Sequence, residues 1–249
     1  MSGHSKWSTI KHKKAAKDAR RGQLFTKLVR EITIAAREDS DLETNFQLRL
    51  AIDKAKEANM PKENIERAIK KGTGELKGAE LEEITYEGYG PYGVAMLVQV
   101  VTDNRRRAVA GVRRILTRQG GSLGESGCVS WLFEPKGYIT IAADTDPDEM
   151  ALMAIDAGAE DVTVGSDLVE VYTGLDDFQL VKEMLEKNEV TLESAEISMI
   201  PKSLTQLGEE ETMRVMKLID ALEDLEDVEQ VYSNLDISDG VMAKYEGAA

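Results

Sequence analysis

The spacing of apolar residues changes near residue 78, and this change sets the fold class. Before it, apolar residues recur at helical spacing in three stretches, and three short helices can bury such stripes only against each other. The stripes are Phe25, Leu28, Val29 and Ile32; Leu48, Ile52 and Ala55; and Ile65, Ala68 and Ile69. Pro61 suits the first turn of the third helix and Gly72 its end. The sequence therefore predicts a helical N-terminal bundle.

Strand-like runs follow the glycines Gly72, Gly74 and Gly78. A run at 94–101 predicts a buried strand, 104–119 a helix ended by Gly120-Gly121, and 129–133 a further strand. This middle segment lacks a second helix and a last strand of its own. A C-terminal helix and strand within 209–237, the strand at 228–234, supply both. The middle domain is therefore predicted to be discontinuous.

Residues 137–200 give the order βαββαβ, which is the ferredoxin-like motif. The expected strands are 138–142, 162–164, 168–172 and 195–200, and the expected helices are 148–157 and 178–187. We therefore expect an α+β fold, with an N-terminal three-helix bundle and two ferredoxin-like α+β domains, one inserted in the other. The expected domains are 1–78, then 79–134 together with 205–240, and the inserted 135–204.

Charge is distributed very unevenly along the 249 residues. The net charge of −15 divides into +6 over 1–75, zero over 76–135 and −21 over 136–249. The first 30 residues hold nine Lys and Arg and one acidic residue, Asp18. This asymmetry predicts a basic surface for nucleic acid beside an acidic remainder. A solubilising charge balance is the alternative interpretation.

The basic residues near the N-terminus fall on one side of a helix, if the segment is helical. Lys13, Lys14, Lys17, Arg20 and Arg21 lie within an arc of about 120°. Such a stripe can follow a phosphate backbone. The basic residues, which also include Lys11, interleave with His4, Trp7 and His12. The rings of these three side chains can stack on bases. A solvated helix face is the alternative.

A second basic cluster begins and follows the helix predicted at 104–119. It consists of Arg105, Arg106, Arg107, Arg113, Arg114 and Arg118. Arginines at a helix N-terminus oppose the helix dipole. They therefore point to an anionic partner or to internal pairing with the acidic remainder, and both alternatives stay open.

No pattern indicates catalysis, a cofactor or a metal site. The G-x-G-x-x-G match that begins at Gly88 leads into a strand and carries Pro91, so it predicts a turn rather than a dinucleotide fingerprint. Both histidines, His4 and His12, lie in the basic segment, and Cys128, the single cysteine, precedes a strand-like run. Without a long apolar run or a secretory signal, we expect a cytoplasmic protein with no membrane segment.

Several motifs in one order resemble the YebC family, also called the PmpR or translational-activator family. They are Gly3-His-Ser-Lys-Trp7, Ile10-Lys-His-Lys-Lys14, Phe25-Thr-Lys-Leu28, Arg30-Glu-Ile32, Ala51-Ile-Asp-Lys-Ala-Lys56, Asn59-Met-Pro-Lys62, Asn64 to Gly74, Tyr86-Glu-Gly-Tyr-Gly-Pro91, Thr102-Asp-Asn-Arg105, Gly120-Gly121 and Trp131-Leu-Phe133. The sequence departs from the usual pattern in the 38–46 loop and at Tyr92, Arg106, Ala108 and Cys128.

The resemblance implies a helical bundle and two α+β domains around a cleft, without catalytic activity. It also implies two roles. Bacterial members regulate transcription by binding promoter DNA. Others, including the mitochondrial activator of cytochrome c oxidase translation, act with the ribosome at proline-containing stretches. The basic N-terminal motif would carry the nucleic-acid contact in either role: Lys6, Trp7, Lys11, His12, Lys13, Lys14, Lys17, Arg20 and Arg21.

We therefore expect a non-enzymatic DNA-binding transcriptional regulator, and the alternative is a translation factor that binds ribosomal RNA. The expected site adds Arg105, Arg106, Arg107, Arg113 and Arg114 to the N-terminal motif. The acidic C-terminal region would repel nucleic acid or meet a protein partner. The sequence contains no helix-turn-helix, which argues against tight sequence-specific readout.

Overall fold

The computed structural model describes residues 18–78, 80–142, 146–165 and 168–248. Its N-terminal part is the predicted three-helix bundle of α2 (Asp18–Glu38), α3 (Phe46–Glu57) and α4 (Lys62–Gly72). The three predicted stripes form its core. Pro61 precedes α4 at the N-cap and lies outside the first turn, a small correction. Gly72 ends α4 against α2, where a Cβ atom would lie 2.5 Å from the Thr33 carbonyl oxygen.

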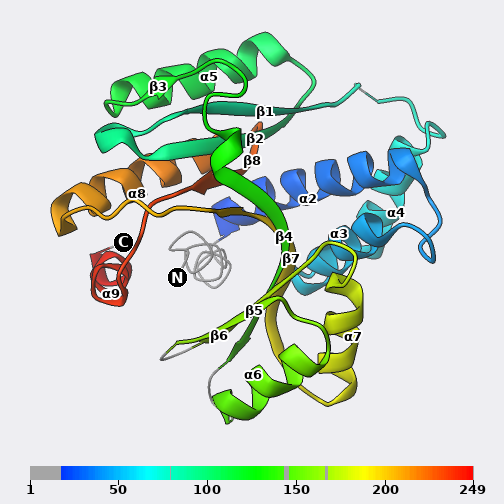
Figure 1. The fold of residues 1–249 in the computed structure, drawn as a ribbon. Coiled ribbons are helices and arrows are strands. Elements are labelled where there is room, and N and C mark those ends of the chain that lie inside the picture. Colours follow the sequence, from blue (N-terminus) through cyan, green and yellow to red (C-terminus); the bar gives the residue numbers. More distant parts are fainter. Residues whose placement is uncertain (1–17, 79, 143–145, 166–167, 249) are drawn as a thin grey trace.

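The first sheet joins the middle of the chain to its C-terminal part. Its order is β3 (Ser122–Leu123), β1 (Glu82–Tyr89), β2 (Ala95–Thr102) and β8 (Val228–Ser233), with antiparallel neighbours. Helices α5 (Arg105–Arg118) and α8 (Glu209–Glu223) share a core with β2 and β8 (Figure 1). The C-terminal helix and strand thus complete this sheet, as the fold prediction requires. The structure adds β1, β3 and α9 (Asp239–Ala248), which the apolar pattern did not predict.

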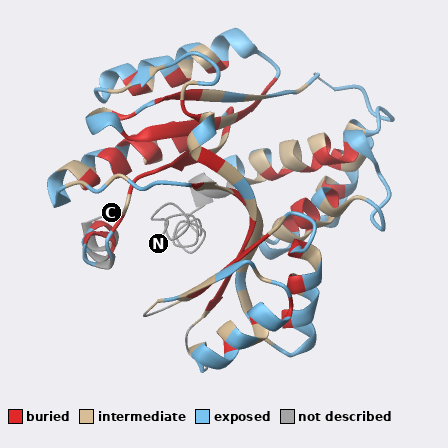
Figure 2. Cartoon of the chain, in the orientation of Figure 1, coloured by how far each residue is buried: buried red, intermediate tan, exposed pale blue. Residues whose placement is uncertain are grey.

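The second sheet has the βαββαβ order. Its strands are β4 (Phe133–Ala142), β5 (Asp161–Val164), β6 (Leu168–Thr173) and β7 (Leu192–Pro201), in the order β5-β6-β4-β7. The helices α6 (Pro147–Asp156) and α7 (Phe178–Lys187) share its core. Figure 2 shows buried residues concentrated along the strands of both sheets. The α+β class with one ferredoxin-like unit inserted in another is confirmed.

The strand predicted at 129–133 is wrong. Ser130–Leu132 forms a 3-10 turn, and β4 begins at Phe133. The reason lies in Glu87, whose carboxylate accepts hydrogen bonds from the amides of Gly127, Val129 and Ser130 at 2.7–2.8 Å. Amides that donate to a carboxylate are not available to a strand ladder.

The turn predicted at Gly88–Gly93 is present. It joins β1 to β2 through a 3-10 turn at Pro91–Gly93. Tyr92 adopts φ 61°, a left-handed conformation that favours glycine. Its hydroxyl accepts a hydrogen bond from Arg214 on α8 at 3.0 Å, which links the turn to that helix.

The helical bundle packs against both α+β units. Lys27 on α2 donates to the Glu223 carbonyl at the end of α8, at 2.7 Å. Phe46 on α3 meets Phe178 on α7 edge to face, with ring centroids 5.3 Å apart. Leu50 on α3 belongs to the core of the inserted unit. The three parts therefore meet around a shared interior space.

Candidate nucleic-acid interface

Most of the predicted N-terminal contacts lie outside the described residues. These are His4, Lys6, Trp7, Lys11, His12, Lys13, Lys14 and Lys17. Arg20 and Arg21 lie in the first turns of α2, so their helical placement agrees with the prediction, but their side chains are outside the description. Among the predicted contacts, those with described side chains therefore lie on α5.

Helix α5 presents arginines to solvent along its length. Asn104 caps it by accepting a hydrogen bond from the Arg107 amide, and Ala108, Val112 and Leu116 bury the opposite face. The exposed side chains are those of Arg105, Arg106, Arg107, Arg113, Arg114 and Arg118. An exposed row of guanidinium groups provides forked donors that suit phosphate.

Arg107 differs from its neighbours because it is paired within the protein. Its Nε and one terminal nitrogen donate to the two Asp227 oxygens at 3.0 and 2.7 Å, and it also contacts Asp103 at 2.8 Å. Burial raises the pKa of Asp227, but its bonds to Arg107 and Thr102 outweigh burial and leave that pKa below its usual value. Internal pairing therefore holds for Arg107.

The other four predicted α5 arginines make no ion pair with the described residues. They are Arg105, Arg106, Arg113 and Arg114, and Arg118 resembles them in this respect. The sequence left two alternatives open for these arginines, internal pairing and an anionic partner. The two alternatives apply to different arginines of the same helix. Arg107 ties α5 to the chain before β8, and the remaining arginines form a cationic surface.

An exposed aromatic pair lies at the end of β1. The Trp131 side chain is 66% exposed, and its indole nitrogen donates to the Cys128 carbonyl at 3.2 Å. The Tyr89 hydroxyl donates to the same carbonyl at 3.3 Å. Glu87 holds the surrounding loop through its three amide bonds. The two rings are therefore held in place at the surface, as a stacking platform requires.

The aromatic pair was missed by sequence reasoning, and no sequence signal would have revealed it. Trp131 lies midway between Val129 and Phe133, so a strand would place all three side chains on one buried face. Only the 3-10 turn sends Trp131 outward while Val129 and Phe133 remain buried.

Cys128 has the environment of a structural thiol. Burial raises the pKa of its thiol, and the nearby Glu87 carboxylate raises it further. A raised pKa leaves little thiolate, which is the reactive form. Within the described ranges, no three His, Cys, Asp or Glu side chains are placed to hold a metal ion. No helix among those ranges combines the length and the apolar character needed to cross a bilayer.

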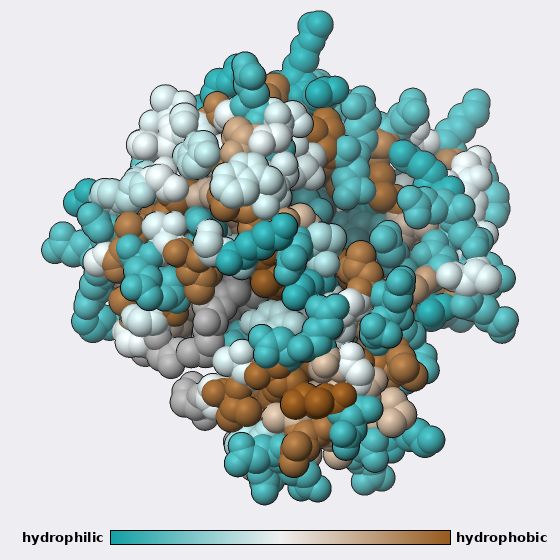
Figure 3. Space-filling model, viewed as in Figure 1, coloured by the Kyte–Doolittle hydropathy of each residue, from teal (hydrophilic) through white to brown (hydrophobic). Residues whose placement is uncertain are grey.

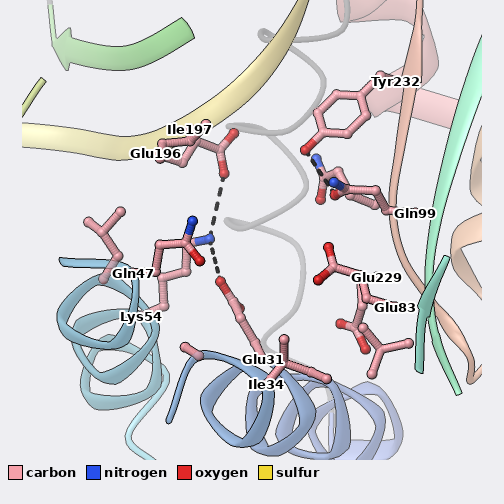
Figure 4. A pocket seen from close by; sticks show the side chains of 14 residues that line it. Glu31, Ile34, Gln47, Lys54, Glu83, Gln99, Glu196, Ile197, Glu229 and Tyr232 are labelled. Atoms are coloured by element: carbon pink, nitrogen blue, oxygen red, sulfur yellow. Dashed lines mark hydrogen bonds and ion pairs between the residues drawn. The ribbon is translucent and has the colours of Figure 1, made fainter. Parts of the chain in front are cut away.

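The space where the three parts meet is acidic. One cavity of about 260 Å³ is lined by four glutamates, Glu31, Glu83, Glu196 and Glu229, and by one basic residue, Lys54 (Figure 4). A neighbouring cavity of about 710 Å³ shares most of these groups. Carboxylates repel phosphate, so this central cavity is unsuited to nucleic acid, and the basic surface of α5 remains the better candidate.

The outer face of the inserted unit carries exposed hydrophobic side chains. Figure 3 shows hydrophobic side chains gathered over the lobe of α6, β5 and β6. Leu152 and Ile155 on α6 and Leu180 on α7 are each more than half exposed. This lobe carries few cations and contributes nothing to a phosphate-binding surface.

The sequence matches family models over most of its length. Residues 5–75 match the TACO1/YebC N-terminal domain, and residues 81–235 match the TACO1/YebC second and third domain. A probable transcriptional regulatory protein of Dehalococcoides mccartyi is 55% identical over all of both chains, and one of Persephonella marina is 54% identical over 98% of this chain and 99% of that one. The crystal structure of a hypothetical protein from Aquifex aeolicus superposes with a TM-score of 0.82 at 51% identity, covering 89% of this chain and 93% of that chain.

Proposed function

Because the chain belongs to the TACO1/YebC family, we propose that it is a regulatory protein that acts by binding nucleic acid and not by catalysis. The names of its relatives favour the regulation of transcription, with DNA as the ligand. The observation that carries the proposal is the charge distribution. The N-terminal 75 residues have a net charge of +6, and the α5 arginines are exposed, whereas the last 114 residues carry −21.

The proposed contact begins in the N-terminal basic motif. Lys13, Lys14, Lys17, Arg20 and Arg21 neutralise phosphates along one strand. About five such contacts give a log–log salt slope of about −4.5 on duplex DNA. Arg113 and Arg114 on α5 supply further exposed cations for phosphate. The acidic remainder repels the backbone and so orients the bound strand.

A ribosome-associated role is the second candidate, and the aromatic pair favours it. Duplex DNA keeps its bases stacked, whereas single-stranded RNA offers unpaired bases to aromatic side chains. Trp131 and Tyr89 provide such a platform, at about 1–3 kcal/mol per stacked base. The platform gives the protein a means to prefer ribosomal RNA over duplex DNA.

The test compares promoter-length duplex DNA with purified ribosomes at physiological salt, with competitor DNA present. The test variant replaces Lys13, Lys14, Lys17, Arg20 and Arg21 with Ala. The matched control replaces five other basic residues of the N-terminal domain with Ala, all of them exposed: Lys62, Arg67, Lys70, Lys71 and Lys77. Both variants lose five positive charges, so the comparison separates a specific surface from net charge.

We expect the test variant to lose most of its affinity and the control to keep most of it. Equal losses in both variants would reduce the interaction to net charge, and unchanged affinity in the test variant would sink the proposal. Ribosome binding that survives competitor, with weak and steeply salt-dependent DNA binding, would favour translation. Tight, sequence-selective DNA binding without ribosome association would favour transcription.

A further inference from the structure

The outer side of helices α6 and α7 carries apolar side chains that the core of the inserted unit leaves out. Both helices bury one side against the second sheet, and they contact each other. On the opposite side, α6 exposes Leu152 and Ile155, and α7 exposes Leu180 and Met184. The residues of each pair lie three or four positions apart, so each pair forms a stripe along its helix. The two stripes together are called the outer apolar face.

Helix α6 has apolar residues on every side. Met150 and Ala154 are buried against the sheet, Met153 is half-buried, and Leu152 and Ile155 are exposed. Figure 3 shows hydrophobic side chains gathered over this helix. A single exposed leucine is ordinary, but apolar residues all around a helix are typical of a helix that is covered all around. The sheet covers only the inner side of α6, so a partner is needed for the outer side.

Carboxylates surround the outer apolar face. Exposed acidic residues are Asp148, Glu149 and Asp156 on α6, and Glu183 and Glu186 on α7. The whole of 135–204 holds sixteen Asp and Glu and four Lys, a net charge of −12. The apolar face therefore lies within a strongly negative surface.

The cations of α7 do little to offset this charge. The Lys182 side chain is only 15% exposed and lies 3.7 Å from Glu186. Lys187 lies in the last turn of α7, beyond Leu180 and Met184. Neither lysine therefore neutralises the carboxylates beside the α6 stripe.

Charge decides which class of partner suits this face. Nucleic acid and anionic membranes are repelled by the carboxylates, and a second copy of the chain would place the same carboxylates opposite each other. The backbone groups of α6 and α7 are bonded within the helices, so the partner cannot add a strand and must satisfy its own backbone. These conditions are met by a helix with one apolar and one basic side.

We propose that the outer apolar face of α6 and α7 binds a basic amphipathic helix of a partner protein. Apolar side chains of that helix cover Leu152, Ile155 and Leu180, and its Lys and Arg side chains meet the surrounding carboxylates. This interaction goes beyond the proposed function, since neither the N-terminal basic motif nor α5 takes part in it. The acidic inserted unit thereby gains a protein ligand of its own.

The probe is a fluorescein-labelled synthetic amphipathic helix of leucine and lysine, about 14 residues long. Its binding to the full-length protein is measured by fluorescence anisotropy, beside a peptide of the same composition in scrambled order. The test variant combines Leu152→Gln, Ile155→Gln and Leu180→Gln. The matched control makes the same change at three exposed leucines outside the inserted helices, Leu42, Leu76 and Leu204. Neither variant alters the net charge, and thermal denaturation checks that both fold.

A second pair of variants tests the carboxylates. Asp156→Asn with Glu183→Gln removes two charges beside the outer apolar face, and Glu75→Gln with Glu80→Gln removes two exposed charges elsewhere. We expect the first pair to weaken binding and to reduce its salt dependence, and the second pair to change both much less. Equal effects of the two pairs would overturn the assigned charge complementarity.

We expect the test variant to bind the amphipathic peptide about ten-fold more weakly than the parent, and the control variant to stay within about two-fold of it. Equal losses in both variants, or equal binding of the scrambled peptide, would reduce the interaction to net charge and overturn the proposal. Sedimentation velocity that showed a dimer of the parent, lost in the test variant, would reassign the face to a second copy. Cosedimentation with vesicles of anionic phospholipid, lost in the same variant, would reassign it to a membrane.

Discussion

Lys54 on α3 lies 3.0 Å from Glu31 on α2 and 3.9 Å from Glu196 on β7, so one ammonium group joins the helical bundle to the inserted unit. Burial lowers the pKa of Lys54, but Glu31 and Glu196 together outweigh burial and raise that pKa above its usual value. The residue is therefore charged at every pH at which the protein is studied. Its role is to offset the repulsion between the Glu31 and Glu196 carboxylates of the acidic cavity.

Replacing Lys54 with Met is expected to lower the free energy of unfolding by about 1–3 kcal/mol, since Glu31 and Glu196 are left without their shared cation. The Lys54 side chain is 31% exposed, which keeps the cost below that of a fully buried pair. Urea denaturation measures the change.

The control for this substitution is Lys56→Met on the same helix. Lys56 is 65% exposed and, among the described residues, pairs only with the exposed Asp53, so a change within about 0.5 kcal/mol is expected. Equal effects of the two substitutions would show that the Lys54 contacts are not special.

The pH dependence of stability should report Glu229. Its pKa is raised to about 8 in the folded protein, above the usual 4.5, because the folded protein buries it. Between these values the unfolded chain has released a proton that the folded chain retains, so stability falls as pH rises from about 4.5 to about 8. Glu229→Gln should remove this component and gain stability over the parent at pH 8, by an amount that vanishes near pH 4.

The comparison uses chemical denaturation of parent and variant from pH 4 to pH 9. Lys27, Arg30, Lys54 and Glu31 all act on the same carboxyl group, so each protein needs its own full curve. If the free energies of unfolding of parent and variant changed in parallel with pH over the whole range, burial would not alter the ionisation of Glu229.

Glu87 should stabilise the loop that presents Trp131. Burial raises the pKa of Glu87, but three backbone amide bonds outweigh burial and lower it. The sign of this contribution is therefore opposite to that of Glu229: it is present above about pH 4.5 and is lost as pH falls through the lowered pKa. Glu87→Gln should lower the free energy of unfolding at pH 7 by about 2 kcal/mol.

The same substitution should loosen Trp131, and acrylamide quenching in a Trp7→Phe background measures this. Glu125→Gln in the same loop is the control, because Glu125 is exposed and makes none of the three amide bonds. A loop that quenches alike in all variants would mean that Glu87 does not fix the platform.

The helical bundle and the βαββαβ unit could be predicted because their burial follows local periodicity. Leu28 and Ile32 on α2 are buried in the core of the bundle, as their helical spacing predicts. Val169 and Val171 on β6 are buried in the core of the inserted unit, as strand alternation predicts. Strand β1 escaped prediction because half of its residues are exposed, among them Glu82 and Glu83, and so it lacks an apolar run.

The interior features were beyond prediction because they depend on how distant parts pack. Glu229 follows Val228 in β8 and points to the opposite face of the sheet, which alternation assigns to solvent. The helical bundle and β7 cover that face and close the Oε1 atom of Glu229 to solvent. Likewise, the Arg107–Asp227 pair joins residues 120 positions apart.

The arginines of α5 should separate into two classes by mutation. Arg107→Ala should lower the free energy of unfolding by about 1 kcal/mol, because the 52% exposure of Arg107 screens its pair with Asp227. Arg113→Ala with Arg114→Ala should leave stability within about 0.5 kcal/mol, since both side chains are exposed and unpaired among the described residues. Their loss should instead weaken DNA binding and reduce the salt slope by roughly one for each phosphate contact removed.

Thermal denaturation and salt titrations of DNA binding on the same preparations give both quantities. Asp227→Asn is the partner control for Arg107, because it removes the charge of the pair and keeps its shape. Arg107 and Asp227 should show a coupling energy of about 1 kcal/mol in a double-mutant cycle, whereas Arg113 and Asp227 should show none. If Arg107→Ala lowered the salt slope as much as the Arg113 and Arg114 pair, all the α5 arginines would face the phosphate backbone. The division between structural and binding arginines would then be wrong.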